Sequence, residues 1–245
     1  MAESSPLENV RVVLCGTSHP GNIGASARAM KTMGLAALYL VNPKRFPAPE
    51  ADAMATNATD VLEHAIVCAT LDEALAGTLY AVACTARSRD LSHEVLTARE
   101  AGARLAREAV QGPVALVFGP EKTGLTAEDV SRCSVIAMVP ASPEYSSLNL
   151  AAAVQIFAYE LRQSVDVIDR YPQEAYEIAP FEAVENFIRH LEQTLYDIEF
   201  LDPQQPKRLV QRMRRLFRRA RLEKEEVNIL RGILTAAQKA RKGNS

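Results

Sequence analysis

Short apolar segments alternate with amphipathic ones along the first two-thirds of the chain. Six segments are brief, apolar on both faces and bounded by turn formers, which predicts the strands of a covered parallel sheet: Val10–Cys15, Ala36–Val41, Ala65–Ala69, Leu79–Thr85, Val114–Phe118 and Val135–Val139. Helical spacing of apolar residues lies between or after them, in Ile23–Met33, Ala98–Val110 and Leu148–Gln163. This alternation predicts an α/β domain. The last helix is apolar nearly all round in its first half, which predicts burial.

The pattern changes after residue 165. Segment 166–179 breaks the periodicity and contains Pro172, which indicates a linker. Beyond it the spacing is helical throughout, in Phe181–Phe200, Leu209–Ala220 and Val227–Ala240. We therefore predict an α/β domain over residues 1–165, a linker over 166–179 and a small all-helical domain over 180–245.

Charge is distributed unevenly between the two predicted domains. The chain of 245 residues has a net charge of −2, yet residues 207–245 hold 13 lysines and arginines against three acidic residues. The helical end is therefore basic and the remainder acidic. This asymmetry favours nucleic acid as a partner over the plainer interpretation of a solvated helix face.

Composition excludes several classes of protein. No apolar run approaches the roughly 20 residues that a membrane helix needs, and the acidic N-terminus lacks the apolar core of a secretory signal. The four cysteines are scattered, without a C-x-x-C pair or a histidine cluster: Cys15, Cys68, Cys84 and Cys133. They indicate free thiols in a reducing compartment. We expect a cytoplasmic protein that uses neither membrane nor metal.

Three segments at the ends of predicted strands contain candidate chemistry. They are H-P-G-N-I-G-A-S-A-R at 19–28, L-V-F-G-P-E-K-T-G-L at 116–125 and P-A-S-P-E-Y-S-S-L-N-L at 140–150. Ligands of open α/β sheets bind at this edge. The first segment matches neither G-x-G-x-x-G nor a P-loop, which argues against a nucleotide-dependent oxidoreductase. Taken singly, each segment also fits a structural role: a surface Arg28, a solvated Glu121, or an N-cap at Ser146 or Ser147.

Together the three segments resemble the motifs of the SPOUT class of RNA methyltransferases. The matching patterns are N-x-G-x-x-x-R, F-G-P-E-x-x-G-L and P-E-Y-S-S-L-N-L-A. Similarity to class members that methylate a tRNA ribose extends to A-R-A-M-K-T-M-G-L (27–35), L-V-N-P (40–43), T-L-D-E-A-L-A-G (70–77) and V-N-I-L-R-G-I-L (227–234). The resemblance therefore covers nearly the whole chain.

The resemblance implies a fold, a cofactor and a substrate. The fold would be a parallel-sheet SPOUT domain with a C-terminal trefoil knot, followed by the small helical domain. The cofactor would be S-adenosyl-L-methionine, and the substrate the 2′-hydroxyl of the pyrimidine (C or U) that opens the tRNA anticodon loop. Members of the class are homodimers, with the active site completed across an interface that contains the helix after Leu148.

The resemblance also implies site residues. The cofactor would be bound by Cys84, Thr85, Ala86, Gly119, Val139, Ser146, Ser147 and Leu148. The catalytic side would comprise Asn22, Arg28, Glu121, Tyr145 and Asn149. One departure from close relatives is Cys84-Thr85 in place of an expected Thr-Ser pair, which backbone contacts would tolerate.

Arg28 is the catalytic group that the resemblance implies. Because arginine keeps its proton in proteins, we interpret it as a bidentate clamp on the target phosphate rather than as a base. Glu121 would orient Arg28 or Asn22. Tyr145 would either stack on a base or hold its loop in place.

The basic segment 207–221 contains eight basic residues and no acidic one. Its apolar residues recur at helical spacing, so we expect a stripe of arginines that meets the RNA backbone: Arg208, Arg212, Arg214, Arg215, Arg218 and Arg219. Two alternatives stay open. One is a sister SPOUT enzyme that methylates another tRNA or rRNA ribose, and the other is a non-catalytic RNA-binding protein with the same fold.

Overall fold

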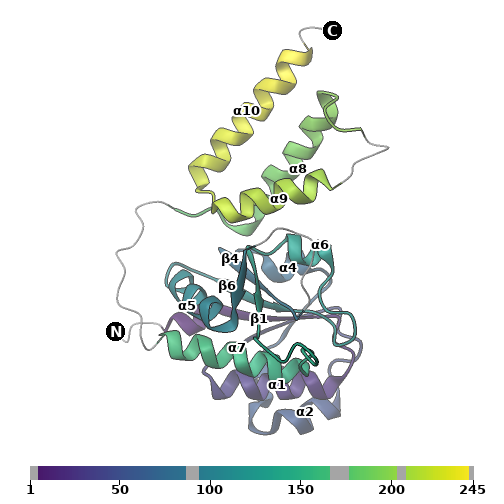
Figure 1. Cartoon of the computed structure of the whole chain (residues 1–245), viewed down its shortest axis with the longest axis vertical. Helices are drawn as coiled ribbons and strands as arrows, with labels where there is room; N and C mark the ends of the chain where they lie inside the picture. Colours follow the sequence, from purple (N-terminus) through teal and green to yellow (C-terminus); the bar gives the residue numbers. More distant parts are fainter. Residues whose placement is uncertain (1–4, 87–93, 166–176, 203–207, 243–245) are drawn as a thin grey trace. The chain divides into compact units, whose positions relative to one another are not determined.

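The chain forms two compact units in a computed structural model, residues 1–173 and 174–245 (Figure 1). The structure describes residues 5–86, 94–165, 177–202 and 208–242. Most of the predicted linker, 166–176, lies outside the described residues, whereas Ile178 and Ala179 at its end are buried in the second unit. None of the described helices combines the length and apolar character needed to cross a bilayer.

The first unit is built on a seven-stranded sheet in the order β3-β2-β1-β6-β4-β7-β5. Every pairing between neighbouring strands is parallel, which confirms the predicted α/β class. The strands are β1 (Val10–Cys15), β2 (Ala37–Val41), β3 (Ile66–Cys68), β4 (Tyr80–Cys84), β5 (Val95–Thr97), β6 (Val114–Phe118) and β7 (Val135–Met138). Because β1, β6, β4 and β7 are consecutive neighbours, the loops after them meet at one edge. The trefoil knot stays a prediction.

Helices cover both faces of this sheet. They are α1 (Pro20–Thr32), α2 (Pro49–Ala55), α3 (Thr59–Glu63), α4 (Leu71–Leu75), α5 (Ala98–Ala109), α6 (Ala127–Ser131) and α7 (Leu150–Val165), with short 3₁₀ turns at Pro6–Asn9 and Thr56–Ala58. Helix α7 contacts both α1 and α5, and Figure 1 shows α4 and α6 on the opposite side of the sheet from α1 and α7. The hydrophobic pattern did not predict β5, α2, α3, α4 and α6, because these segments are too short to show a helical or strand repeat of apolar residues.

Two predictions of burial need correction. Strand β3 is an edge strand: Ile66 and Val67 are 48% and 57% exposed, although the segment was predicted to be covered on both faces. Helix α7 buries one face through residues such as Phe157, whereas Ala152 in its first half is exposed and Tyr159 in its second half is 48% exposed. Apolar composition all round a helix therefore does not mean burial within a single chain.

The second unit is helical over the residues that the structure describes, as predicted, apart from an isolated bridge between Ile178 and Glu223. It contains α8 (Phe181–Asp197), α9 (Leu209–Ala220) and α10 (Lys224–Lys242). Its core joins Phe187, Ile188 and Val227, and the rings of Phe187 and Phe217 meet edge to face with centroids 4.6 Å apart. An apolar face on each helix thus holds the unit together.

Candidate active site

A cavity of about 140 Å³ opens where β4, β6 and β7 end. All eight residues predicted to bind the cofactor line it, from the segments 84–86, 119, 139 and 146–148. Sequence reasoning missed the part of the wall formed by α7, which includes Ala153 and Phe157. Phe157 meets Phe118 edge to face, with ring centroids 5.7 Å apart. These residues were overlooked because, in sequence, they are indistinguishable from ordinary core positions.

The chemistry of the wall suits a ligand with an apolar ring and polar edges. Ser146, Ser147 and Leu148 make no hydrogen bond to any other residue that the structure describes, so their backbone groups are available to a ligand. The aromatic pair formed by Phe118 and Phe157 supplies apolar surface beside them. An apolar cavity with a few convergent polar groups is typical of a cofactor site, and adenosine has this character.

Gly119 is required by its own loop. A Cβ atom at this position would lie 2.2 Å from the backbone nitrogen of Leu125 and 2.4 Å from the carbonyl carbon of Gly124. The strand end and the following turn therefore pass too close for any side chain. It is the chain's own close approach that requires a glycine here. Any side chain here would displace the loop next to Glu121.

Loop 17–22 wraps around the carboxylate of Glu121, because β1 and β6 are neighbours. Oε2 accepts hydrogen bonds from the backbone nitrogen and the hydroxyl of Ser18, at 3.0 and 2.8 Å. Oε1 accepts from Nδ2 of Asn22 at 2.9 Å and from the backbone nitrogen of His19 at 3.3 Å. An ionised carboxylate has about four acceptor sites, so these four donors fill it.

This environment keeps Glu121 ionised. Burial acts to raise the pKa of Glu121, but the hydrogen bonds from Asn22 and Ser18 outweigh it and lower the pKa to about 2. A carboxylate with this pKa is a weak base near neutral pH. The geometry therefore supports the predicted orientation of Asn22 by Glu121. It gives Glu121 no contact with Arg28.

Asn149 links this carboxylate to the start of α7. Its Nδ2 donates to Oδ1 of Asn22 at 3.0 Å, and its Oδ1 accepts from the backbone nitrogens of Ala151 and Ala152 at 2.9 and 3.4 Å. Asn149 is therefore the N-cap of α7, which corrects the expectation of a cap at Ser146 or Ser147. Hydrogen bonds run in one direction from the helix terminus through both asparagines to Glu121.

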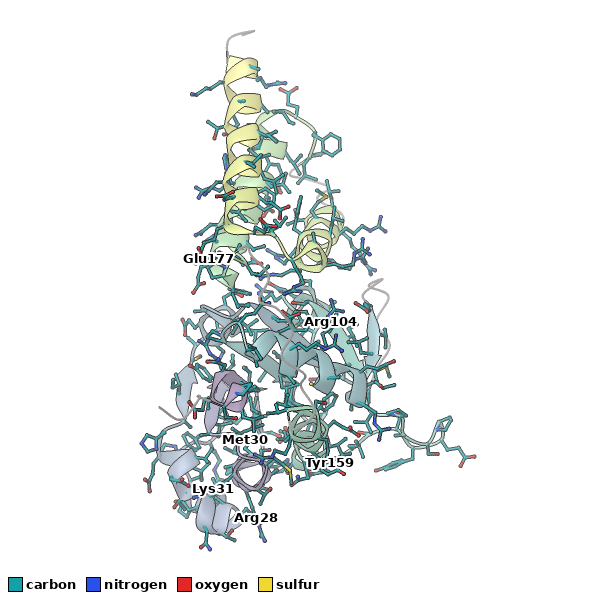
Figure 2. The ribbon with its side chains drawn as sticks, turned by 90° about the vertical axis from the view of Figure 1, so that its left-hand side faces the viewer. Arg28, Met30, Lys31, Arg104, Tyr159 and Glu177 are labelled. Atoms are coloured by element: carbon teal, nitrogen blue, oxygen red, sulfur yellow. The ribbon has the colours of Figure 1, made fainter. Side chains whose placement is uncertain are left out.

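Arg28 and Tyr145 lie apart from the cavity wall within one chain. Arg28 is exposed on α1 and makes no hydrogen bond or ion pair with any described residue (Figure 2). Tyr145 is 80% exposed, and its backbone nitrogen donates to the Ser142 carbonyl at 3.1 Å. Asn22, Glu121 and Asn149 are thus brought together, whereas the other two predicted catalytic-side residues face outward.

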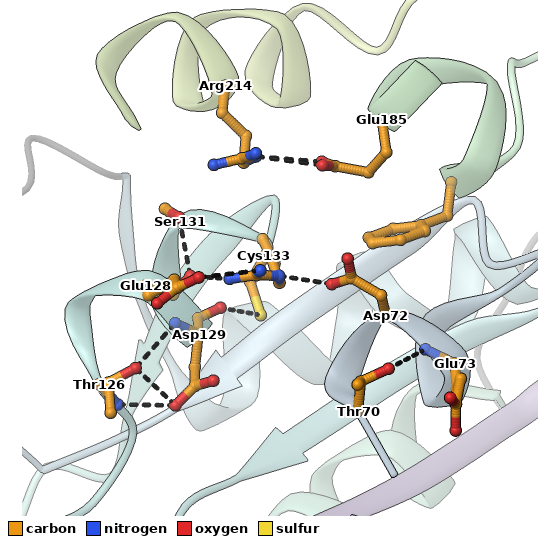
Figure 3. Close-up of polar contacts among 12 residues, drawn as sticks. Thr70, Asp72, Glu73, Thr126, Glu128, Asp129, Ser131, Cys133, Glu185 and Arg214 are labelled. Atoms are coloured by element: carbon orange, nitrogen blue, oxygen red, sulfur yellow. Dashed lines mark hydrogen bonds and ion pairs between the residues drawn. The ribbon is translucent and has the colours of Figure 1, made fainter. Parts of the chain in front are cut away.

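The predicted arginine stripe divides into two groups. Arg214 and Arg218 pair with Glu185 of α8 at 3.2 and 3.0 Å, and the Arg218 guanidinium lies over the Phe181 ring (Figure 3 shows the Arg214 pair). These two side chains hold α9 against α8. The exposed arginines of α9 and its start are Arg208, Arg212 and Arg219, while Arg215 is half-buried.

Both units match known protein families. Residues 9–159 match the model of the SpoU rRNA Methylase family, and residues 182–245 match the C-terminal domain of the tRNA methyltransferase TrmJ. The chain is 51% identical over 240 residues to the tRNA (cytidine/uridine-2′-O-)-methyltransferase TrmJ of Yersinia pestis (strain Pestoides F), covering 95% of this chain and 93% of the relative. The enzyme of the same name from Escherichia coli O6:K15:H31 is 48% identical over 97% of this chain and 98% of its own.

A solved structure supports the same relationship. The crystal structure of TrmJ from Z. mobilis ZM4 superposes with a TM-score of 0.82 at 34% sequence identity. The match covers 92% of this chain and 97% of that one. Both sequence and fold are therefore similar over almost the full length of these relatives.

Proposed function

The chain belongs to the SpoU rRNA methylase family, and from this premise we propose that it is an S-adenosyl-L-methionine-dependent tRNA ribose 2′-O-methyltransferase. Its target would be the pyrimidine, C or U, that opens the anticodon loop. The observation that carries the proposal is that two motif segments, 116–125 and 140–150, line one cavity, and that Asn22 of the third segment is hydrogen-bonded to Glu121 and Asn149 from these two. The full-length similarity to cytidine/uridine-2′-O-methyltransferases supports the substrate.

In the proposed reaction the bound donor supplies a methyl group that its sulfonium already activates. The wall residues of the cavity would bind and orient the donor and exclude water. Asn22 and Asn149 each use one amide hydrogen within the chain of hydrogen bonds, which leaves the second for an oxygen of the substrate. Glu121 would hold these amides and take no proton, so the proton of the ribose hydroxyl would pass to a phosphate oxygen of the RNA or to water. Because the donor is already activated, the proposal requires no metal.

The direct test is methylation of tRNA by the purified protein with labelled donor, followed by mass spectrometry of the nucleosides and their positions. The expected product is a 2′-O-methylated C or U that opens the anticodon loop. Methylation at another tRNA or rRNA ribose would support a sister enzyme. Donor binding without methylation of any RNA would contradict the catalytic proposal.

We also propose a homodimer in which Arg28 serves the cavity of the partner subunit. Arg28 is exposed and lies outside the wall of its own cavity, and Tyr145, Leu148 and Tyr159 are exposed apolar or aromatic residues at 80%, 39% and 48%. A second copy would cover this surface. The guanidinium would then grip the target phosphate, which fixes the ribose hydroxyl in line with the methyl group.

Mixed dimers test this arrangement. Arg28→Ala is inactive in our proposal, and so is Ala86→Trp, which places a large ring at the exposed mouth of the cavity. If Arg28 acts across the interface, a heterodimer of the two variants has one intact site, and random mixing restores about a quarter of wild-type activity. No recovery in a verified heterodimer would refute action in trans. Calorimetry on Ala86→Trp confirms that donor binding is lost.

The exposed arginines of α9 are the surface that we propose for RNA binding. Arg208, Arg212 and Arg219 would contact the tRNA backbone, with Arg215 beside them and Arg214 and Arg218 holding the helix that carries them. A cytoplasmic location follows from the tRNA substrate. The four cysteines are all buried free thiols, which is compatible with a reducing compartment.

A further inference from the structure

Ser18 contacts the site but belongs to none of the three motifs. It lies in the loop between β1 and α1, next to the N-cap position at His19, and is half-buried. Its backbone nitrogen and its hydroxyl both donate to the same oxygen of Glu121, Oε2, at 3.0 and 2.8 Å. Two donors of Ser18 thus bind one carboxylate oxygen of a residue 103 positions away, which is more than the closing of a local turn requires.

The contact decides how the rest of the site is oriented. With Oε2 occupied by Ser18, Oε1 is the oxygen that receives Nδ2 of Asn22. Because a carboxylate only accepts, the carboxylate that Ser18 holds in place keeps Nδ2 of Asn22 toward itself and the Asn22 oxygen toward Asn149, whose Nδ2 donates to it at 3.0 Å. An amide can flip about its last bond at little intrinsic cost, so its orientation depends on such fixed partners.

We propose that Ser18 is a positioning residue for methyl transfer, acting through Glu121 on the amides of Asn22 and Asn149 at the start of α7. The inference rests on the proposed function for its kinetic test. It adds the loop after β1 to the motif segments that meet around Glu121. Ser18 itself is not required to touch donor or substrate.

The test uses three variants of the full-length protein. Ser18→Ala removes the hydroxyl but keeps the backbone donor, and Ser18→Thr keeps both. Ser131→Ala is the matched control, because this buried hydroxyl donates to the Glu128 carbonyl at 2.7 Å within α6. Single-turnover methylation, the KM for tRNA and the donor Kd are measured for each.

We expect Ser18→Ala to lower kcat about 10-fold, the rate equivalent of one hydrogen bond to a charged group. The KM for tRNA and the donor Kd should stay within about twofold, because Ser18 lies outside the cavity wall and α9. Ser18→Thr should recover most of the rate. In a Glu121→Gln background the further loss from Ser18→Ala should vanish, since the acceptor of its hydroxyl is already changed.

Three results would overturn the proposal. They are a wild-type kcat in Ser18→Ala, an equal loss in Ser131→Ala, or an undiminished effect of Ser18→Ala in the Glu121→Gln background. A readout independent of activity is the side-chain amide signal of Asn22 in nitrogen NMR, assigned by its loss in Asn22→Asp. It should shift in Ser18→Ala and return in Ser18→Thr. If the wild type methylates no tRNA, the proposed function fails, and the NMR result alone decides the positioning of Asn22.

Discussion

Asn149 and Asn22 are 127 positions apart in the chain, and their side-chain amides meet at 3.0 Å. The contact joins the N-cap of α7 to the first turn of α1, and these two helix starts belong to different motif segments. Asn149 also caps α7 through its Oδ1. The oxygen of the Asn149 amide therefore caps the helix while its nitrogen holds Asn22, and a substitution can remove one of these roles and keep the other.

Asn149→Asp should keep the cap of α7 but lose methylation. Aspartate retains an oxygen for the helix N–H groups and benefits from the helix dipole, but it cannot donate to Oδ1 of Asn22. We expect a loss of at least 10-fold in single-turnover rate, with little change in the melting temperature. In a double-mutant cycle with Asn22→Ala, the two losses should be strongly non-additive. Simple additivity would mean that the two asparagines act independently.

Glu121→Gln should destabilise the protein in a way that depends on pH. The folded pKa of Glu121, about 2, lies below its ordinary value of 4.5, so the ionised side chain stabilises the fold above pH 4.5 and this stabilisation is lost as the pH falls toward 2. Glutamine does not titrate and turns an NH₂ group toward Ser18 or Asn22. The difference in free energy of unfolding between wild type and variant, measured with urea, should therefore become smaller as the pH is lowered. A difference that is constant from pH 6 to pH 3 would contradict the assignment.

Two glycine substitutions should have opposite effects. Gly119→Ala forces the loop at residues 124–125 to move, because its Cβ would lie 2.2 Å from the backbone. We expect it to lower the free energy of unfolding by about 1–3 kcal/mol and to weaken donor binding. Gly232→Ala in α10 meets nothing within 4 Å and should stabilise the protein by about 0.5–1 kcal/mol. Urea unfolding measures both. Destabilisation by Gly232→Ala would reveal a contact on that face of α10.

Substitution of two arginines of α9 should have different effects, one on stability and the other on RNA binding. Arg218→Ala leaves the buried Glu185 with Arg214 alone and removes the stacking on Phe181, so we expect a cost of about 2–3 kcal/mol in unfolding. Arg212→Ala, on an exposed side chain, should stay within about 0.5 kcal/mol. It should weaken tRNA binding and lower the log–log salt slope by roughly 0.7–0.9 if one phosphate contact is lost. An unchanged slope would make Arg212 a solvated residue only.

Apolar periodicity and the motif segments were enough to predict the class of fold and the strand ends where the cavity lies. Apolar runs such as Val114–Phe118 predicted parallel strands because a strand covered on both faces has no polar side. The motif segments pointed to one sheet edge because ligand sites of parallel sheets lie where strands end. The residues 84–86, 119, 139 and 146–148, assigned by resemblance, indeed share one cavity wall.

The local sequence pattern predicted less well those features that depend on which element packs beside a segment. The edge position of β3 depends on the order of strands, which periodicity does not contain, so its exposed Ile66 and Val67 were misjudged. Asn149, not Ser146 or Ser147, caps α7 through its Oδ1, and its Nδ2 donates to Asn22, a partner in another motif that the local pattern does not reveal.

Which polar side chains already have hydrogen-bond or ion-pair partners depends on how the helices and strands pack. Ser18 is an ordinary loop serine in the sequence, but the pairing of β1 with β6 places it against Glu121. Likewise, Arg214 and Arg218 look like the rest of their basic stripe until α8 brings Glu185 between them. Sequence spacing fixes which residues share a helix face or a strand end. Hydrogen bonding and charge pairing depend on distances between elements that are remote in the chain, and those exist only once the elements have packed.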